Sequence, residues 1–195
     1  FVRVNKDGDN SDPMFDYTGT THKGLIEWAL KNYPLGYTPG KTDLDSKTRY
    51  SNFGYCLLGR VIEAKSGKTY QSYVRSKILI PAGAGGMVIG GDKEADRKAN
   101  EVKYYGSGAY SSVKPVRFDS HGGWIATPID LLRFMKHENV FGSSYGHLGQ
   151  MGGTSSALRR RSDGITYAGA ANISATDSAE EMDTMLGEIA NGVSK

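Results

Sequence analysis

The sequence predicts an α+β fold, in which a mainly helical part is followed by an antiparallel hairpin and a packing helix. Apolar residues recur at helical spacing in several segments up to residue 141. The period then changes, and two short strand-like runs flank an Asp-Gly dipeptide, which is a strong hairpin signal. Because these strands follow the helices instead of alternating with them, repeated β-α-β units are not expected.

The first part of the chain contains three predicted helices. Residues 1–20 are polar and rich in turn formers, so we expect a loose arm there. Helices are predicted from His22 to Lys31, from Asn52 to Lys65, and from Thr69 onward. Ser66-Gly67 ends the second helix, since glycine readily takes the left-handed conformation after a helix. Their apolar positions are Leu25, Trp28 and Ala29, then Tyr55, Leu58, Val61 and Ile62, then Tyr70, Tyr73 and Val74.

The middle of the chain is predicted to be mostly loop until a well-marked helix begins. The glycine-rich residues 81–86 lack the Gly-Lys-Ser/Thr ending of a phosphate-binding loop and open no clear helix. Residues 90–120 are polar and dotted with tyrosines, so we expect loop with short extended pieces. In the helix that follows, Thr127 is the predicted cap, Pro128 occupies the first position and Asp130 lies in the first turn.

The last part of the chain carries the predicted strands. Ser155 to Leu158 and Ile165 to Ile173 are joined at the turn 161–164. A helix after Asp177 closes the chain, and its apolar stripe consists of Met182, Met185, Leu186, Ile189 and Val193. The predicted divisions are a loose arm at 1–20, a mainly helical subdomain at 21–145, and C-terminal strands and helix at 146–195.

Composition and charge argue against several classes of function. The 195 residues contain 38% hydrophobic and 23% charged side chains, as in an ordinary globular protein. The net charge is only +3, and the one tight basic cluster, Arg159-Arg160-Arg161, adjoins a turn, so we expect no nucleic-acid partner. No segment is apolar and long enough to span a membrane, and the histidines lack metal-ligand spacing, so neither a metal nor another cofactor is expected. Cys56, the single cysteine, lies in an apolar run and is expected to be a buried, inert thiol.

The most informative polar residues are Tyr50, Ser51 and Asn52, which lead directly into an apolar helix. A phenol and a carboxamide two residues apart at a helix start can point into one cleft. Beside a cation, Tyr50 can carry a proton, and Asn52 can hold an amide or hydroxyl group of a substrate. The residues alone leave another interpretation open, in which Ser51 and Asn52 cap the helix and Tyr50 packs on it.

Several patterns then occur in an order typical of one known family. Tyr37-Thr38-Pro39-Gly40, Tyr50-Ser51-Asn52 and the run from Leu57 to Glu63 resemble the middle of the serine β-lactamase-like family. That family comprises class C β-lactamases, penicillin-binding DD-peptidases and related esterases. Gly122 to Leu131 is similar to its glycine-rich entry to a late helix, and His147-Leu148-Gly149 resembles its Lys- or His-x-Gly motif on a strand lining the cleft. The resemblance extends over about residues 25 to 195, including the strand that follows that motif.

The resemblance implies a serine hydrolase, which transfers an acyl group to water from an amide, an ester or a β-lactam. In such enzymes the nucleophile is the serine of a Ser-x-x-Lys motif, and the lysine activates it. By resemblance, Tyr50 would carry the proton and His147 would take the cationic position of the third motif. Asn52 would hold the substrate amide, while Gly149 and the backbone N–H of Gln150 would bind the substrate carbonyl. The family is mostly exported, which favours a secreted or periplasmic location.

The sequence departs from the family at the nucleophile. No Ser-x-x-Lys precedes Tyr50, and the family's opening strands and serine-bearing helix are not among these residues. The one match, from Ser111 to Lys114, comes after Tyr50, and Pro115 disfavours helical geometry at Lys114. Without the missing parts, a sheet edge and the apolar stripe of the last helix would remain partly uncovered. We therefore expect an N-terminal companion segment or chain that carries Ser-x-x-Lys, or another cover for these surfaces.

Two functions from different classes remain open at this point. The first is a serine hydrolase scaffold that acts on a small peptide, ester or β-lactam once a separate segment supplies the nucleophile. The alternative is a non-catalytic binding or structural protein on the same fold, since loops among the 12 tyrosines could stack on sugars or peptides. Of the remaining histidines, His121 is expected to be structural, and His22 and His137 are expected to be ordinary helix residues.

Overall fold

A computed structural model describes residues 12–34, 51–111, 114–137, 145–173, 175 and 178–193 of the chain. These residues form two compact units. The first unit contains the described residues up to Tyr70 together with Arg117–Gly123, and the second contains Gln71–Val116 and the residues from Trp124 onward. The divisions at residues 20 and 145 rest on the predicted runs of helix and strand, and they stay a prediction.

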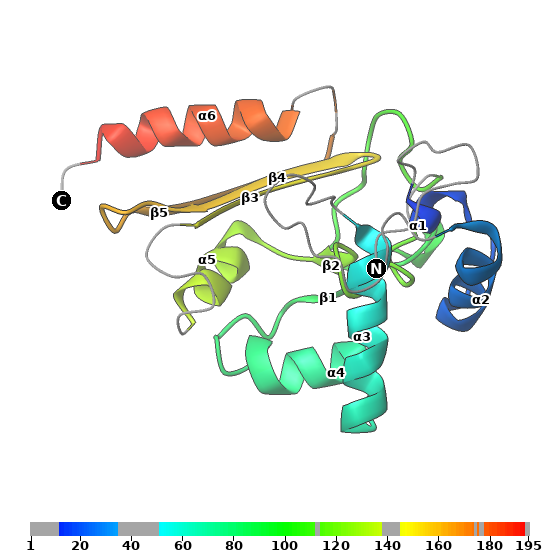
Figure 1. The fold of residues 1–195 in the computed structure, drawn as a ribbon. Helices are drawn as coiled ribbons and strands as arrows, with labels where there is room; N and C mark the ends of the chain where they lie inside the picture. Colours follow the sequence, from blue (N-terminus) through cyan, green and yellow to red (C-terminus); the bar gives the residue numbers. More distant parts are fainter. Residues whose placement is uncertain are drawn as a thin grey trace. The chain divides into compact units, whose positions relative to one another are not determined.

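The first unit is helical, with α1 (Pro13–Asp16), α2 (His22–Asn32) and α3 (Asn52–Ser66) (Figure 1). The two predicted helices of this region are thereby confirmed. Polar side chains begin them as expected: the Thr21 hydroxyl accepts a hydrogen bond from the Gly24 N–H at 3.1 Å, and the Ser51 hydroxyl accepts one from the Gly54 N–H at 3.0 Å. Gly67 ends α3 with a φ of 66°, a left-handed conformation that favours glycine.

Helix α3 buries a different face from the one that its apolar residues predict. Phe53, Cys56 and Gly59 are buried, whereas the side chains of Leu58 and Val61 are 59% and 55% exposed. The buried face is set by close approach, because a Cβ atom at Gly59 would lie 2.6 Å from Oγ of Ser120. Glycine and cysteine carry little hydrophobic signal, so the sequence pattern points to the larger side chains of the neighbouring stripe.

The second unit begins with a short helical region. Helix α4 (Tyr70–Val74) continues as a π-helical turn, η1 (Arg75–Leu79), and the glycine-rich residues after it form turns, as predicted. Strands β1 (Val88–Ile89) and β2 (Trp124–Ile125) pair antiparallel, and helix α5 (Pro128–Lys136) follows. A small core joins these elements and consists of Leu79, Ala84 and Met87, with Val74, Ala82, Trp124, Ala126, Leu131 and Phe134 packed against it.

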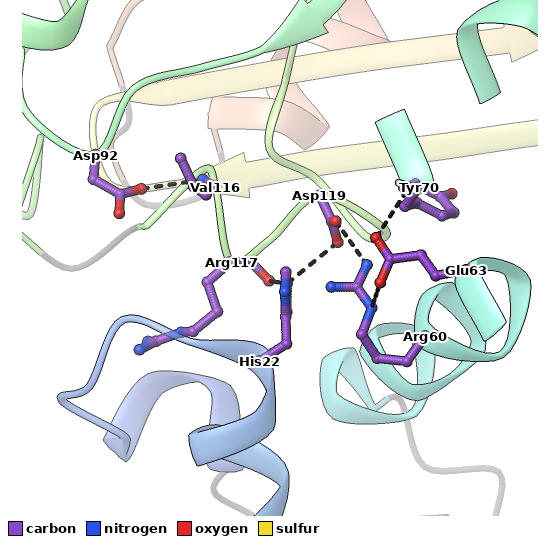
Figure 2. Close-up of polar contacts among 8 residues, drawn as sticks. All are labelled: His22, Arg60, Glu63, Tyr70, Asp92, Val116, Arg117 and Asp119. Atoms are coloured by element: carbon purple, nitrogen blue, oxygen red, sulfur yellow. Dashed lines mark hydrogen bonds and ion pairs between the residues drawn. The ribbon is translucent and has the colours of Figure 1, made fainter. Parts of the chain in front are cut away.

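The loop between β1 and β2 is irregular, as predicted, apart from a short 3₁₀ turn, η2 (Glu94–Asp96). The Val116 N–H donates to Oδ1 of Asp92 at 3.0 Å, which links the start of the loop to a later part of it (Figure 2). At the start of α5, Thr127 and Asp130 form a reciprocal capping box with Pro128 in the first turn, which confirms the predicted helix start.

The second unit also contains a three-stranded antiparallel sheet in the order β3-β4-β5. Its strands are β3 (Tyr145–Met151), β4 (Thr154–Arg160) and β5 (Thr166–Ala171), so the predicted hairpin is confirmed. Gly164 turns the chain between β4 and β5 with a φ of 92°. Helix α6 (Ser178–Asn191) lies along one face of this sheet, and α5 lies on the opposite face (Figure 1).

Helix α6 is fixed to the sheet by an ion pair and by close packing. Arg159 on β4 donates to both carboxylate oxygens of Asp183, and the Tyr167 hydroxyl donates to Oδ1 of Asp183 at 3.0 Å. A Cβ atom at Gly169 would lie 2.6 Å from Sδ of Met182, so α6 packs closely on this part of β5 and a larger residue would push the Met182 side chain aside. The other side of the predicted stripe is exposed, with Met185 at 54% and Ile189 at 61%. None of the described helices is long and apolar enough to cross a lipid bilayer.

Candidate functional site

The predicted site residues are distributed over both units. Tyr50 and the predicted motif at residues 37–40 lie outside the residues that the structure describes. Asn52 is the first residue of α3 in the first unit, whereas His147, Gly149 and Gln150 are on β3 in the second unit. That these five residues form one site therefore stays a prediction. The structure defines the local geometry of all of them except Tyr50.

Asn52 is held at the start of α3 by Asp12, the residue that also caps α1. The Asn52 N–H donates to Oδ2 of Asp12 at 2.6 Å, and the Phe53 N–H donates to Oδ1 of Asp12 at 3.2 Å. Burial raises the pKa of Asp12, and hydrogen bonds from Met14, Phe53 and Asn52 partly offset this rise. A carboxylate at a helix N-terminus is favourable because it accepts otherwise unpaired N–H groups and faces the positive end of the helix dipole.

The Asn52 side chain also hydrogen-bonds to Asp12. A carboxamide has two N–H donors and a carbonyl oxygen, so one such bond leaves further capacity for a substrate amide. Ser51 caps the helix, as the structural interpretation of the triplet predicts. Capping by Ser51 and substrate binding by Asn52 are compatible, because they use different side chains.

Strand β3 presents its predicted site residues on two faces of the sheet. His147 pairs with Leu158, Gly149 with Ser156, and Gln150 with Ser155. Because side chains alternate along a strand, His147 and Gly149 share one face and Gln150 points to the other. His147 is exposed and its ring stacks on that of Tyr145, with centroids 6.4 Å apart.

Gly149 has a specific steric reason to be glycine. A Cβ atom at this position would lie 2.5 Å from Oγ of Ser156 on the neighbouring strand. An alanine at this position would force the Ser156 hydroxyl to rotate away. The glycine of the His-x-Gly triplet thus leaves room for the Ser156 side chain in its present position.

No activated nucleophile is found among the residues that the structure describes. Cys56 is fully buried, and burial raises the pKa of its thiol to about 11, so the reactive thiolate is scarce at neutral pH. The Ser120 hydroxyl is buried and makes no hydrogen bond to any described residue, so no base activates it. Ser112 and Val113 of the pseudo-motif lie outside the described residues, and Lys114 is not helical.

The first unit contains a buried polar cluster that the sequence analysis missed, formed by His22, Arg60, Glu63, Arg117 and Asp119 (Figure 2). Arg60 is at its centre: Nη2 donates to Oδ2 of Asp119 at 2.7 Å, and Nε lies 3.1 Å from Oε2 of Glu63. On the other side of Asp119, Nε2 of His22 lies 3.5 Å from Oδ1. The cluster ties α2 and α3 to the segment 117–123.

The cluster has defined protonation preferences. Nε2 of His22 lies 3.1 Å from the Arg117 carbonyl and close to Asp119, so it must carry the proton and donate. Burial alone would raise the pKa of Asp119, but hydrogen bonds from His22 and Arg60 outweigh it and lower the pKa. Glu63 also accepts from the Tyr70 N–H at 2.8 Å, which joins the end of α3 to the start of α4.

His121 lies beside this cluster and has a structural role, as predicted. Its ring packs on Phe118 with centroids 4.5 Å apart, and its two nitrogens find no hydrogen-bond partner among the described residues. Burial lowers the pKa of His121 to about 4, so the ring is neutral at physiological pH. Since neither His22 nor His121 hydrogen-bonds to a serine or cysteine among the described residues, we interpret the cluster as a cross-link of the fold.

A metal site is not part of this arrangement: within the described ranges, no group of His, Cys, Asp or Glu residues could hold a metal ion. The charged cluster could hardly be predicted from the sequence, because His22 and Asp119 are far apart in the chain and neither lies in a recognisable motif. The one usable signal is that Arg60 and Glu63 are three residues apart on a helix, a spacing typical of ion pairs.

Known proteins resemble this chain in sequence and in fold. A family model described as Beta-lactamase matches residues 12–143. Among curated proteins, "Beta-lactamase-like protein 2" of Dictyostelium discoideum is 30% identical over 92 residues, which are 45% of this chain and 17% of that protein. The chain thus spans only a small part of this relative.

Two solved structures share the fold. A D-amino acid amidase from Ochrobactrum anthropi SV3 matches with a TM-score of 0.69 and 19% identity, over 93% of this chain and 67% of that chain. An octameric penicillin-binding protein homologue from Pyrococcus abyssi matches with a TM-score of 0.59 and 19% identity, over 88% of this chain and 49% of that chain. At these identities the likeness concerns the fold alone, and it confirms the predicted α+β, β-lactamase-like class.

Proposed function

Because the chain belongs to the β-lactamase family, we propose that it forms the substrate-binding part of a serine hydrolase whose nucleophile lies in a separate segment. The observation that carries this proposal is the structure of β3. The triplet His147-Leu148-Gly149 lies on an edge of the described sheet, its glycine faces the Ser156 hydroxyl, and His147 is exposed.

The proposed reaction is acyl transfer to water. A serine of the companion segment attacks the substrate carbonyl carbon, and its proton passes through the lysine and Tyr50 to the leaving amine or alcohol. The Gln150 N–H, with the serine's own N–H, stabilises the negative oxygen that forms. Water then attacks the acyl-enzyme by the same route in reverse, which releases a carboxylic acid and regenerates the serine.

Asn52 and His147 would orient the substrate. Asn52 begins a helix that Asp12 fixes, and its carboxamide would hold a substrate amide. His147 is exposed and would meet an anionic or polar end of the substrate. The structural likeness to a D-amino acid amidase supports a small amide as substrate, with small peptides, esters and β-lactams as the related classes.

The companion segment would also cover surfaces that the described residues leave open. Met185 and Ile189 on the outer face of α6 are more than half exposed, as is Val193 just after the helix. Strand β5 is the second edge of the described sheet. An added strand beside β5 and an apolar element over α6 would bury both, which removes an aggregation-prone edge and an exposed apolar stripe.

The alternative function is a non-catalytic binding or structural protein on the same fold. It is supported by the lack of an activated nucleophile among the described residues, where Cys56 and the hydroxyl group of Ser120 are both buried. The two functions are separated by purifying the native protein and treating it with a fluorescent fluorophosphonate and a fluorescent penicillin. Labelling of a co-purifying segment supports the hydrolase. An intact protein that carries Ser-x-x-Lys and still reacts with neither probe supports the binding protein.

A further inference from the structure

We propose that the side chain of Gln150 fastens β3 to the segment that leads into α6, by a hydrogen bond to the Ala175 carbonyl beside Ser178, and so positions the backbone N–H of the same glutamine. This role makes Gln150 and Ser178 positioning residues. It rests on the proposed function, because the N–H matters for catalysis only if a hydrolase assembles around β3. The contacts themselves are independent of that function.

The side chain of Gln150 contacts the segment that leads into α6. Nε2 of Gln150 donates to the Ala175 carbonyl at 2.8 Å. The Ala175 N–H donates in turn to the Ser178 hydroxyl at 3.3 Å, and this hydroxyl lies 3.5 Å from Oε1 of Gln150. Two hydrogen bonds through Ala175 therefore link Gln150 to Ser178, the first residue of α6.

This hydrogen-bond network has a buried end at Ser155. Ser155 is 1% exposed and pairs with Gln150 across β3 and β4. Its hydroxyl donates to the Ile173 carbonyl at 2.8 Å and also contacts the Ser178 hydroxyl. The same small network thus touches β3, β4, the end of the chain segment after β5, and α6.

The hydroxyl protons of Ser155 and Ser178 determine which contact can hold Gln150. Each serine has one hydroxyl proton, and that of Ser155 is used on the Ile173 carbonyl. Ser178 must then donate to Ser155, which leaves the Nε2–H of Gln150 as the donor that fastens β3. A glutamate at position 150 has the same shape but would place an acceptor against the Ala175 carbonyl.

Strand β3 lies at an edge of the described sheet. It pairs with β4 on one side only among the described strands, so edge hydrogen bonds alone would leave its end free to fray. Gln150 is next to the last residue of the strand, where a second attachment restricts such motion most. An oxyanion-binding N–H must keep its position closely, because small misplacement of a reacting group costs rate.

The test uses the full-length protein that contains this chain, with the variants Gln150→Glu and Ser178→Ala. Glu188→Gln, an exposed change near the far end of α6, is the matched control. Amide hydrogen exchange of β3 and the rate of labelling by a fluorophosphonate are measured for each protein. We expect both variants to exchange faster at residues 148–151 and to label about tenfold more slowly, with Tm and the control unchanged.

The results separate the inference from the proposed function. Unchanged exchange in β3 for both variants would overturn the fastening role, whatever the labelling rate. Faster exchange with an undiminished labelling rate would overturn the positioning role. If the wild-type protein with its Ser-x-x-Lys segment does not label at all, the hydrolase and the positioning role both fail, and exchange still decides whether Gln150 fastens the strand.

Discussion

Gly149 lies directly opposite Ser156 in the sheet. A Cβ atom at residue 149 would lie only 2.5 Å from Oγ of Ser156. This relationship explains a glycine that the sequence shows only as part of a triplet. Any change that separates β3 from β4 at this position also moves the strand that carries His147.

The Gly149→Ala variant should therefore be less stable than the wild type. The new methyl group forces either the Ser156 side chain or the β3 backbone to move, at a cost of about 1–3 kcal/mol in the free energy of unfolding. Urea denaturation measures this cost. The double variant Gly149→Ala with Ser156→Gly should recover most of the loss, and a double variant no more stable than Gly149→Ala would contradict the steric explanation.

Stability should fall as the pH decreases from 7 towards 4, because of His121. Burial lowers its pKa from 6.5 to about 4 in the folded protein, so in this range the unfolded chain takes up a proton that the folded one does not. The difference corresponds to about 3 kcal/mol at most, since one pKa unit is about 1.4 kcal/mol. Urea denaturation at a series of pH values measures it.

The control for this pH dependence is His121→Phe, which keeps a ring against Phe118 and removes the titrating group. The variant should show a flatter stability profile between pH 6.5 and 4. Arg60, Arg117, His22 and Asp119 also act on the His121 pKa and are retained in it. An equally steep profile in the variant would assign the effect to another group.

The ion pair between Arg60 and Asp119 should be costly to break from one side. Both side chains are largely buried, at 15% and 11% exposure, so the Asp119→Asn variant leaves the Arg60 charge with a weaker partner. We expect a loss of about 3 kcal/mol in the free energy of unfolding for Arg60→Met or Asp119→Asn alone. In a double-mutant cycle the two changes together should cost less than their sum, and strict additivity would show that the contact is unimportant.

Cys56 should react with thiol reagents only when the chain unfolds. It is fully buried, and burial raises its pKa to about 11. Labelling by an aromatic disulfide reagent at pH 8 should be slow in buffer and rapid in concentrated urea. Rapid labelling of the folded protein would contradict the packing of α3, in which Cys56 and Phe53 form the buried face.

The sequence predicted the elements of the fold more successfully than their packing. Caps, turns and periodicity are local properties, so Ser51, Gly67 and the Asp163-Gly164 turn marked their elements correctly. The prediction of which face of α3 is buried was wrong, because that face depends on how closely Ser120 approaches Gly59. Such an approach between distant segments leaves no periodic signal.

The candidate site was only partly accessible from the sequence for the same reason. The motif on β3 was found because its residues are consecutive and have a family pattern. The cluster around Arg60 and Asp119 was missed, since its members come from three separate segments and owe their role to burial. The fastening contacts of Gln150 were missed as well, because they join the strand to residues that only the fold brings near.

The most direct test of the central proposal is activity-based labelling of the native protein, followed by mass spectrometry of the labelled peptide. We predict that a fluorophosphonate modifies the serine of a Ser-x-x-Lys segment that co-purifies with this chain, and that Tyr50→Phe slows the modification by at least about 10²-fold. Labelling that is independent of Tyr50, or an intact protein with the motif that never reacts, would contradict the assignment of this chain to a serine hydrolase.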